Sequence, residues 1–332
     1  MSRKVELPII APIFSTYNHQ CAATAIIINN PSIKNWVLNK NVSLFCNRRF
    51  LKGYTTPEIS VIASQYESNP YLEKIYIDLN TNKSQFSALV RHFVDRGYYV
   101  YFNNIDDYYL NGKTWYKERH FFHDGIICGY DRDEKKYCVY AYDSTWTLRK
   151  IWIPYSSFNK GIKSMKASNE NGYIVGLKPT DEKVEFMPQI AIKKVREYLD
   201  SNFKKYPKDQ DGSVYGIVVH DYMQIYLDKL IDGSIPYEKM DYRIFRVIWE
   251  HKKVMLERIK ELEQIFELSK KWSNAYEKIV DEANTMRMLY ASYSMRKRDT
   301  VLSVIKEKLK WINKQERKIL TNLIEVVEEG NE

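Results

Sequence analysis

Two residues that could carry out covalent chemistry stand at the edges of apolar segments. Cys21 comes directly before the apolar stretch 22–28 in YNHQCAATAIIINNP, and His123 precedes the apolar run 125–129 in HFFHDGIICGYD. A thiol in the first turn of a buried helix lies in an environment that favours the thiolate. An imidazole that accepts the proton of such a thiol activates it as a nucleophile. Cys21 and His123 are therefore the candidate nucleophile and base.

An acidic partner for His123 is expected on the hairpin that follows it. Two strand-like runs, 123–129 and 137–143, flank the charged segment 131–136, which is typical of a hairpin loop. A turn centred near residue 133 would place Asp143 opposite His123, with Cβ atoms about 4.5–5.5 Å apart, although a register slip of one or two residues would change the partner. Asp143 is therefore the residue predicted to orient the imidazole. The same register places Cys128 opposite Cys138, and both are expected to be reduced core residues.

The elements that must position these residues fall into two parts of the chain. Pro31 is expected to end the helix that begins near Asn18, its N-cap. The remaining patterns predict strands at 74–79, 98–102, 125–129, 137–142, 149–153 and 172–177, with helices at 21–30, 56–64 and 84–96. After a polar linker at 178–183, apolar residues recur at helical spacing in 190–203, 216–231, 242–266 and 269–327, the last broken at least once.

Composition limits the class of protein further. The chain has 332 residues, of which 44% are hydrophobic and 28% charged, as in a globular protein with room for two domains. No apolar run is long enough to span a bilayer, and prolines interrupt the N-terminal segment, so we expect no secretory signal. Four cysteines without a CxxC pair predict neither a disulfide framework nor a zinc site. The sequence thus predicts a cytoplasmic protein without a metal.

The net charge of +9 suggests a type of partner. Residues 287–318 contain ten basic and three acidic residues, a run that could attract nucleic acid, an anionic membrane or an acidic protein. Its simpler interpretation is the solvated face of a helix. Because no nucleic-acid-binding motif accompanies the run, we favour an acidic protein partner. Its candidate docking residues are Arg296, Lys297, Arg298 and Lys306.

The order of Cys21, His123, Gly129-Tyr130-Asp131 and Tyr142-Asp143-Ser144 resembles a papain-like cysteine peptidase domain. More narrowly, the chain resembles the butirosin biosynthesis protein H family of acyltransferases, and more distantly the cysteine-protease-like amide-forming enzyme of closthioamide assembly. The resemblance implies an α+β fold, with a papain-like catalytic domain at 1–182 followed by a helical domain at 183–332. It implies Cys21, His123 and Asp143 as a catalytic triad.

The implied activity is transfer of an acyl or aminoacyl chain from a carrier-protein thioester to a small amine, through an acyl-enzyme on Cys21. No cofactor is implied, since the acyl chain arrives on the phosphopantetheine of an acyl or peptidyl carrier protein. Papain-like enzymes place an oxyanion-hole glutamine about six residues before the cysteine, but Ser15 stands there in this chain. The donors expected instead are the Cys21 N–H with Asn18 or Gln20. A peptidase or amidase with the same triad, and a nucleic-acid-binding protein, are the alternatives, and the oligomeric state is left open.

Overall fold

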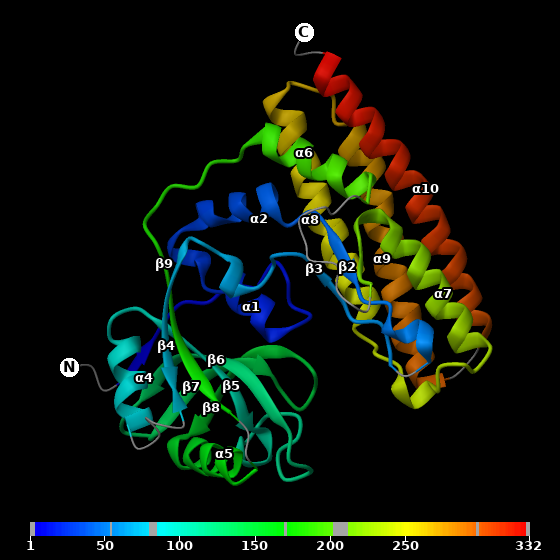
Figure 1. Cartoon of the computed structure of the whole chain (residues 1–332). Coiled ribbons are helices and arrows are strands. Elements are labelled where there is room, and N and C mark those ends of the chain that lie inside the picture. Colours follow the sequence, from blue (N-terminus) through cyan, green and yellow to red (C-terminus); the bar gives the residue numbers. More distant parts are fainter. Residues whose placement is uncertain are drawn as a thin grey trace. The chain divides into compact units, whose positions relative to one another are not determined.

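The chain divides into two compact units in the computed structural model, which describes residues 4–53, 55–79, 85–168, 171–201, 212–296 and 299–329 (Figure 1). The sheet unit comprises residues 1–33 and 65–183, and the helical unit comprises 34–64 and 184–332. The helical domain was expected to begin at residue 183, and the second segment of the helical unit begins at residue 184. Residues 34–64 differ from the expectation, because they belong to the helical unit and not to the first domain.

Long-range contacts hold residues 34–64 in the helical unit. The buried guanidinium of Arg258 donates to the carbonyls of Leu38, at 2.7 Å, and Asn41, at 3.1 Å. His251 Nε2 similarly contacts the carbonyl oxygen of Val42 at 2.6 Å. These partners are more than 200 residues apart in the sequence, so no local pattern could reveal them.

An antiparallel sheet forms the centre of the sheet unit. In the described part of the chain its order is β4-β9-β5-β6-β7-β8, and β1 pairs with β6 outside that path. The strands are β1 (Lys4–Glu6), β4 (Leu72–Asp78), β5 (Tyr99–Asp106), β6 (Phe122–Asp131), β7 (Lys136–Tyr142), β8 (Leu148–Pro154) and β9 (Tyr173–Pro179). All six strand positions expected in this part of the sequence are confirmed, since each predicted run lies at or within one residue of an observed strand.

Each face of this sheet carries its own apolar core. Helix α1 (Asn18–Thr24) packs on one face, where Cys21 lies among residues such as Ile126 and Cys128. Helices α4 (Phe86–Val94) and α5 (Tyr155–Ala167) pack on the other face, where Ile127 is buried (Figure 1). Neighbouring residues of β6 thus alternate between the two cores, as expected for a strand covered on both sides.

Close approach of two strands explains the glycine in the Gly-Tyr-Asp motif. Glu6 of β1 pairs with Gly129 of β6. A Cβ atom at Gly129 would lie 2.5 Å from the Val5 carbonyl oxygen and 3.0 Å from the Glu6 Cα atom. Any side chain there would push β1 away, so the glycine is required by this contact.

Three local predictions differ from the structure. The helix expected at 56–64 is wrong: residues 59–61 form β3 (Ile59–Val61), where buried Ile59 and Val61 alternate with Ser60. The helix expected at 21–30 ends at Thr24, and Pro31 begins a 3-10 turn (Pro31–Ile33) before helix α2 (Lys34–Lys40). The helix α5 was not predicted, because its segment is polar and contains Gly161.

The helical unit has four helices in close contact. Helix α9 (Lys271–Arg296) contacts both α8 (Ile244–Ile265) and α10 (Asp299–Glu329), and α10 also contacts α7 (Val219–Ile231). The described part of the unit also contains helix α2, helix α6 (Pro188–Leu199) and a three-stranded sheet, β10-β2-β3, with β2 at Leu44–Cys46 and β10 at Val214–Tyr215. The helical spacing in this half therefore predicted its class correctly. In the described residues, no helix combines the length and apolar character needed to cross a membrane.

A buried ion pair and its two tyrosine partners link the four helices α6, α8, α9 and α10. Lys252 Nζ of α8 lies 2.6 Å from Glu316 Oε2 of α10, and both side chains are fully buried. The carboxylate also accepts hydrogen bonds from the hydroxyls of Tyr198, at 2.9 Å, and Tyr276. Burial lowers the pKa of Lys252, while the adjacent Glu316 acts in the opposite direction. Such a pair is tolerated because both charges are surrounded by partners.

Candidate active site

Cys21 occupies the middle of the short helix α1 and is 1% exposed. Its N–H donates to the carbonyl of Tyr17, the residue at the N-cap position, at 2.9 Å. Asn18 is therefore the first helical residue and not the cap that the sequence pattern predicted. Because the Cys21 N–H is already bonded within the helix, it is not available as the oxyanion donor that we expected.

The side chain of Asn18 ties this helix to the strand that carries His123. Its Nδ2 atom donates to the carbonyl of Asp124, at 3.1 Å, and to Asp124 Oδ1, at 2.8 Å. The hydroxyl of Tyr101 donates to the other carboxylate oxygen at 2.8 Å. Burial and the Asp124 carboxylate both raise the pKa of Tyr101, which keeps its phenol protonated as a donor. Both hydrogens of the Asn18 amide are thus directed at Asp124.

His123 lies at the start of β6, and its two ring nitrogens face different groups. Nδ1 lies 3.3 Å from Asp107 Oδ2 and 3.3 Å from Lys113 Nζ. Nε2 lies 3.4 Å from Asp124 Oδ1, the oxygen that also accepts from Asn18. The ring is 32% exposed on its side chain, whereas the side chains of Asp107 and Lys113 are completely buried. His123 is therefore the point at which a buried ion pair meets solvent.

Asp143 is held by its own turn, and no hydrogen bond or ion pair joins it to His123 among the described residues. Its Oδ1 accepts hydrogen bonds from the backbone of Thr145, at 2.8 Å, and Thr147, at 3.0 Å. Its Oδ2 pairs with the half-exposed Arg149. Burial opposes ionisation of Asp143, but these partners outweigh it, so its pKa lies below the usual value. Asp143 thus closes the turn between β7 and β8.

The expected register is present in part of the hairpin. Ile126 pairs with Tyr140 and Ile127 pairs with Val139, as the register that opposes His123 to Asp143 requires. A bulge then shifts the pairing, and Gly129 pairs with Cys138. At the other end, His123 pairs with Ile105 of β5. The pairing with β5 places His123 beside the acidic residues that follow that strand.

Gln20 differs from Asn18 in having an unsatisfied amide. The residue is 1% exposed, and its Nε2 atom has no hydrogen-bond partner within the described ranges. A buried N–H without a partner costs free energy, so such groups call for an explanation. Of the side chains expected to donate to an oxyanion, Gln20 is the one that retains a free donor.

The other three thiols are core residues, as the sequence indicated. Burial and the neighbouring Glu58 raise the pKa of Cys46 to about 12. The bulge in β6 pairs Cys138 with Gly129, so the expected register is wrong at Cys128, but the sulfur atoms of Cys128 and Cys138 still lie 3.5 Å apart as free, buried thiols. The hydrogen bond to Cys138 and burial raise the pKa of Cys128. Cys46 and Cys128 are therefore poor sources of thiolate at neutral pH.

A second histidine–aspartate pair lies next to the first. His120 Nδ1 lies 2.6 Å from Oδ2 of the buried Asp106, and Ser164 donates to the same oxygen at 2.6 Å. The His120 side chain is 57% exposed, and its ring stacks on Tyr108 with centroids 4.5 Å apart. Among the described residues His120 has no hydrogen bond or ion pair with Asp124, the residue that joins His123 to Asn18 of α1. This pair supplies a comparison for the chemistry of His123.

Sequence reasoning missed Asp107, Lys113 and Asp124. Asp106 and Asp107 form an acidic pair immediately after a buried strand, which was a usable signal. Their proximity to His123 depends on a bulge in β5 between Phe102 and Ile105, and a bulge cannot be placed from sequence alone. Lys113 carried no signal, since a lysine is rarely buried unless it is paired.

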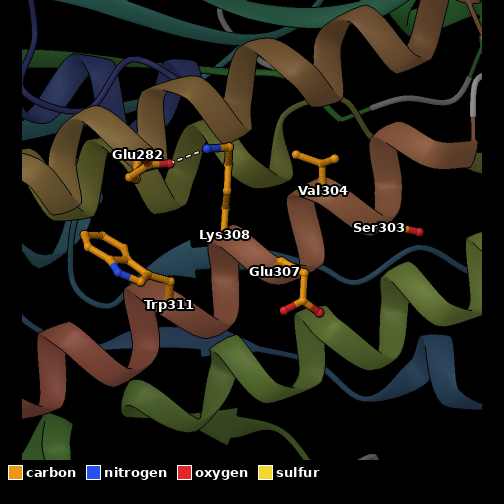
Figure 2. Close-up of a pocket in the computed structure, with 6 residues that line it drawn as sticks. All are labelled: Glu282, Ser303, Val304, Glu307, Lys308 and Trp311. Atoms are coloured by element: carbon orange, nitrogen blue, oxygen red, sulfur yellow. Dashed lines mark hydrogen bonds and ion pairs between the residues drawn. The ribbon is translucent and has the colours of Figure 1, made fainter.

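Two hollows lie along α9 and α10 of the helical unit, and Trp311 lines both. One, of about 510 Å³, is lined by Val304 and Trp311, with Lys308 paired to Glu282 at 2.6 Å (Figure 2). The other, of about 470 Å³, contains Trp272 with three lysines, Lys271, Lys278 and Lys318. Neither is lined by a cysteine or a histidine.

The docking residues expected in the basic run are largely outside the described residues. These are Lys297, Arg298 and the side chain of Arg296. Lys306 is described, and it forms an ion pair with Asp228 on α7. Its charge is therefore partly neutralised within the helical unit.

Comparisons leave the family open. Within the described residues, no group of three or more His, Cys, Asp or Glu side chains is arranged to hold a metal ion. The chain matches no protein-family model, and a search of curated proteins finds no significant match. Arguments about function therefore rest on the geometry around Cys21 and His123.

Proposed function

We propose that the protein is a cysteine-dependent acyltransferase, with Cys21 as nucleophile and His123 as base. The observation that carries the proposal is the contact of His123 Nδ1 with the buried carboxylate of Asp107, at 3.3 Å. His123 lies on β6, and the hydrogen bond from Asn18 to Asp124 joins this strand to α1, the helix of Cys21. A carboxylate at Nδ1 holds the ring so that Nε2 can accept a proton. Asp107 takes the role that the sequence analysis gave to Asp143.

The proposed reaction has two halves. In the first, the Cys21 sulfur attacks the carbonyl carbon of a thioester while His123 takes the thiol proton. The C–S bond to the carrier then breaks, and the departing pantetheine thiolate receives that proton. An amine next attacks the acyl-enzyme, and its proton passes through His123 back to the Cys21 sulfur as the amide forms. The first half thus exchanges the carrier thioester for a thioester on Cys21, and the second half forms the amide.

The proposed oxyanion donor is the Gln20 side chain. Negative charge develops on the carbonyl oxygen in both halves of the reaction, and a fixed donor stabilises it. Gln20 has a buried Nε2 without a partner, whereas the Cys21 N–H and the Asn18 amide are already bonded. Reassigning the donor to Gln20 also gives its unsatisfied amide a function.

Burial of the thiol favours transfer over hydrolysis. Cys21 is 1% exposed, so the acyl-enzyme would form where water is largely excluded. Its intermediate would then wait for an amine that fits the site. The net charge of +9 is compatible with an acidic carrier protein as the donor of the acyl chain.

A papain-like arrangement in the manner of the butirosin biosynthesis protein H family is part of the proposal. It is supported by a cysteine on a helix against an antiparallel sheet, and by a histidine at the start of β6, six residues before Gly129. The helical unit following the sheet unit agrees with the organisation implied by that resemblance. The chain differs from the expectation on two points. Residues 34–64 belong to the helical unit, and His123 contacts Asp107 instead of Asp143.

Side-by-side substrates test the proposal. Purified protein is given an acyl-pantetheine thioester with a small primary amine and, separately, a peptide bearing the same acyl group. We expect amide formation from the thioester that is abolished in Cys21→Ala and His123→Ala and retained in His120→Ala. Cleavage of the peptide without amide formation would identify a peptidase or amidase instead. No reaction with either substrate would contradict both assignments.

A further inference from the structure

The buried Lys113 ammonium competes with Asp107 for the same atom of His123. Lys113 is 1% exposed, and its Nζ lies 3.3 Å from His123 Nδ1, 3.5 Å from Asp107 Oδ1 and 3.3 Å from the carbonyl oxygen of Asp124. An ammonium can only donate hydrogen bonds, and a carboxylate can only accept them. One nitrogen of the ring thus faces a donor and an acceptor at equal distances.

Each protonation state of the ring satisfies these neighbours differently. With its proton on Nε2, neutral His123 accepts from Lys113 at Nδ1 and donates to Asp124 Oδ1. With its proton on Nδ1, it donates to Asp107, but the Nε2 lone pair then faces Asp124 Oδ1 across 3.4 Å. In that state two acceptors oppose each other, and Lys113 loses an acceptor. The doubly protonated ring bonds both carboxylates but places a cation beside the ammonium.

We propose that Lys113 holds the resting His123 as the neutral ring with its proton on Nε2. That form leaves one opposed pair of acceptors, Nδ1 and Asp107 Oδ2, and the Lys113 ammonium lies within 3.5 Å of both Nδ1 and the Asp107 carboxylate. The form with its proton on Nδ1 leaves two unfavourable contacts, Nδ1–H against the ammonium and Nε2 against Asp124 Oδ1. The ring protonated on Nε2 cannot accept the Cys21 proton through that atom. Lys113 is therefore a positioning residue. In the free protein it prevents His123 from deprotonating the Cys21 thiol until the proton leaves Nε2.

Activation then requires a proton at Nδ1 and loss of the proton from Nε2. The 32% exposure of the His123 side chain allows water to deliver the first proton and to remove the second. A donor that disturbs the contact between Nε2 and Asp124 would favour this exchange, because it removes the acceptor that holds the Nε2 proton. His123 can in this way act as a base towards Cys21 only when an acyl donor is bound.

Two measurements that do not need turnover test this inference. It rests on the proposed function for the role of Cys21, but ¹⁵N NMR of the histidine rings reports the position of the proton directly. In the wild-type protein at neutral pH we expect His123 to be protonated on Nε2 alone. A neutral ring protonated on Nδ1, or a doubly protonated ring, would overturn the inference whether or not the protein transfers acyl groups.

Substitution of Lys113 supplies the second measurement. In Lys113→Met, Asp107 remains as the partner of Nδ1, so the proton of the neutral ring should move from Nε2 to Nδ1, and alkylation of Cys21 should rise about tenfold or more because Nε2 can then accept the thiol proton. Lys113→Arg keeps the charge, so it should show the wild-type spectrum and the wild-type rate of Cys21 alkylation. An unchanged spectrum in a folded Lys113→Met protein would contradict the inference. Should that variant fail to fold, the wild-type and Lys113→Arg spectra still decide it. Absence of acyl transfer with the expected spectra would refute the proposed function alone.

Discussion

Oδ2 of Asp107 lies 3.3 Å from Nδ1 of His123, and the carboxylate is completely buried. Asp143, by contrast, directs its oxygens to Thr145, Thr147 and Arg149. The two aspartates are each next to a turn, yet only Asp107 contacts the imidazole. This difference gives the account its clearest contrast in mutagenesis.

We predict that Asp107→Asn lowers kcat/KM for acyl transfer about 10²–10⁴-fold, because the ring loses the acceptor that fixes the reactive tautomer. The matched control is Asp143→Asn, which keeps Oδ1 as acceptor for Thr145 and Thr147 and should stay near wild type. Steady-state kinetics on folded variants measures both. A large loss in Asp143→Asn with little change in Asp107→Asn would restore Asp143 as the triad member.

The sequence could predict the strands of the sheet unit because their apolar runs are continuous and short. It could also predict the helical half, since a spacing of three and four residues persists through α8 and α10. It could not place residues 34–64, because the contacts of Arg258 and His251 that retain them cross more than 200 residues.

Of the residues in the candidate site, the sequence indicated Cys21, His123 and Gln20, and their catalytic roles stay predictions. Cys21 and His123 stand out by type and by their position beside apolar runs. The acidic partner was misplaced because pairing of His123 with β5, not with β7, determines its neighbours. A buried lysine such as Lys113 has no signature in the sequence, because its burial depends on an ion pair with Asp107.

We predict that Cys21 is alkylated by iodoacetamide before Cys46 and Cys128 in the native protein at neutral pH. All four cysteines are buried, so thiolate content should decide the order, and the pKa values of Cys46 and Cys128 are raised. Cys138 is left out of the comparison, because its hydrogen bond with Cys128 lowers its pKa. Peptide mapping of partially labelled protein measures it. Because the resting His123 ring carries its proton on Nε2, His123→Ala should leave the labelling rate of Cys21 in the free protein near that of the wild type. Preferential labelling of Cys46 or Cys128 would be incompatible with the assignment.

A double-mutant cycle tests the buried pair of the helical unit. Lys252→Met or Glu316→Gln alone should lower the free energy of unfolding by about 3–5 kcal/mol, since each leaves a buried group without its partner. The double variant should lose less than the sum of the two, by more than about 1 kcal/mol. Urea unfolding of the four proteins gives these values. Strict additivity would show that the two side chains do not stabilise each other.

Two buried histidines predict acid sensitivity. Burial and the nearby Lys252 hold the pKa values of His220 and His251 well below the ordinary histidine value of 6.5. The unfolded chain binds these protons first, so stability is complete above pH 6.5 and falls as the pH drops below it. Each histidine contributes a slope of up to about 1.4 kcal/mol per pH unit.

Urea unfolding between pH 7.5 and 5.5 measures this dependence. His220→Asn keeps a donor for the Ile217 carbonyl, and His251→Gln keeps one for Val42. Each substitution should remove the contribution of that histidine to the slope of the unfolding free energy against pH. A slope that survives in the double variant would assign the acid sensitivity to other groups.

The central claim is that Cys21 forms an acyl-enzyme with the help of His123. Intact-mass analysis after incubation with a short acyl thioester of N-acetylcysteamine tests it most directly, followed by mapping of the adduct. We expect the mass of one acyl group on Cys21, absent in Cys21→Ala, formed much more slowly in His123→Ala, and unchanged in Cys46→Ser. An adduct on another cysteine, or equal rates in wild type and His123→Ala, would contradict the claim.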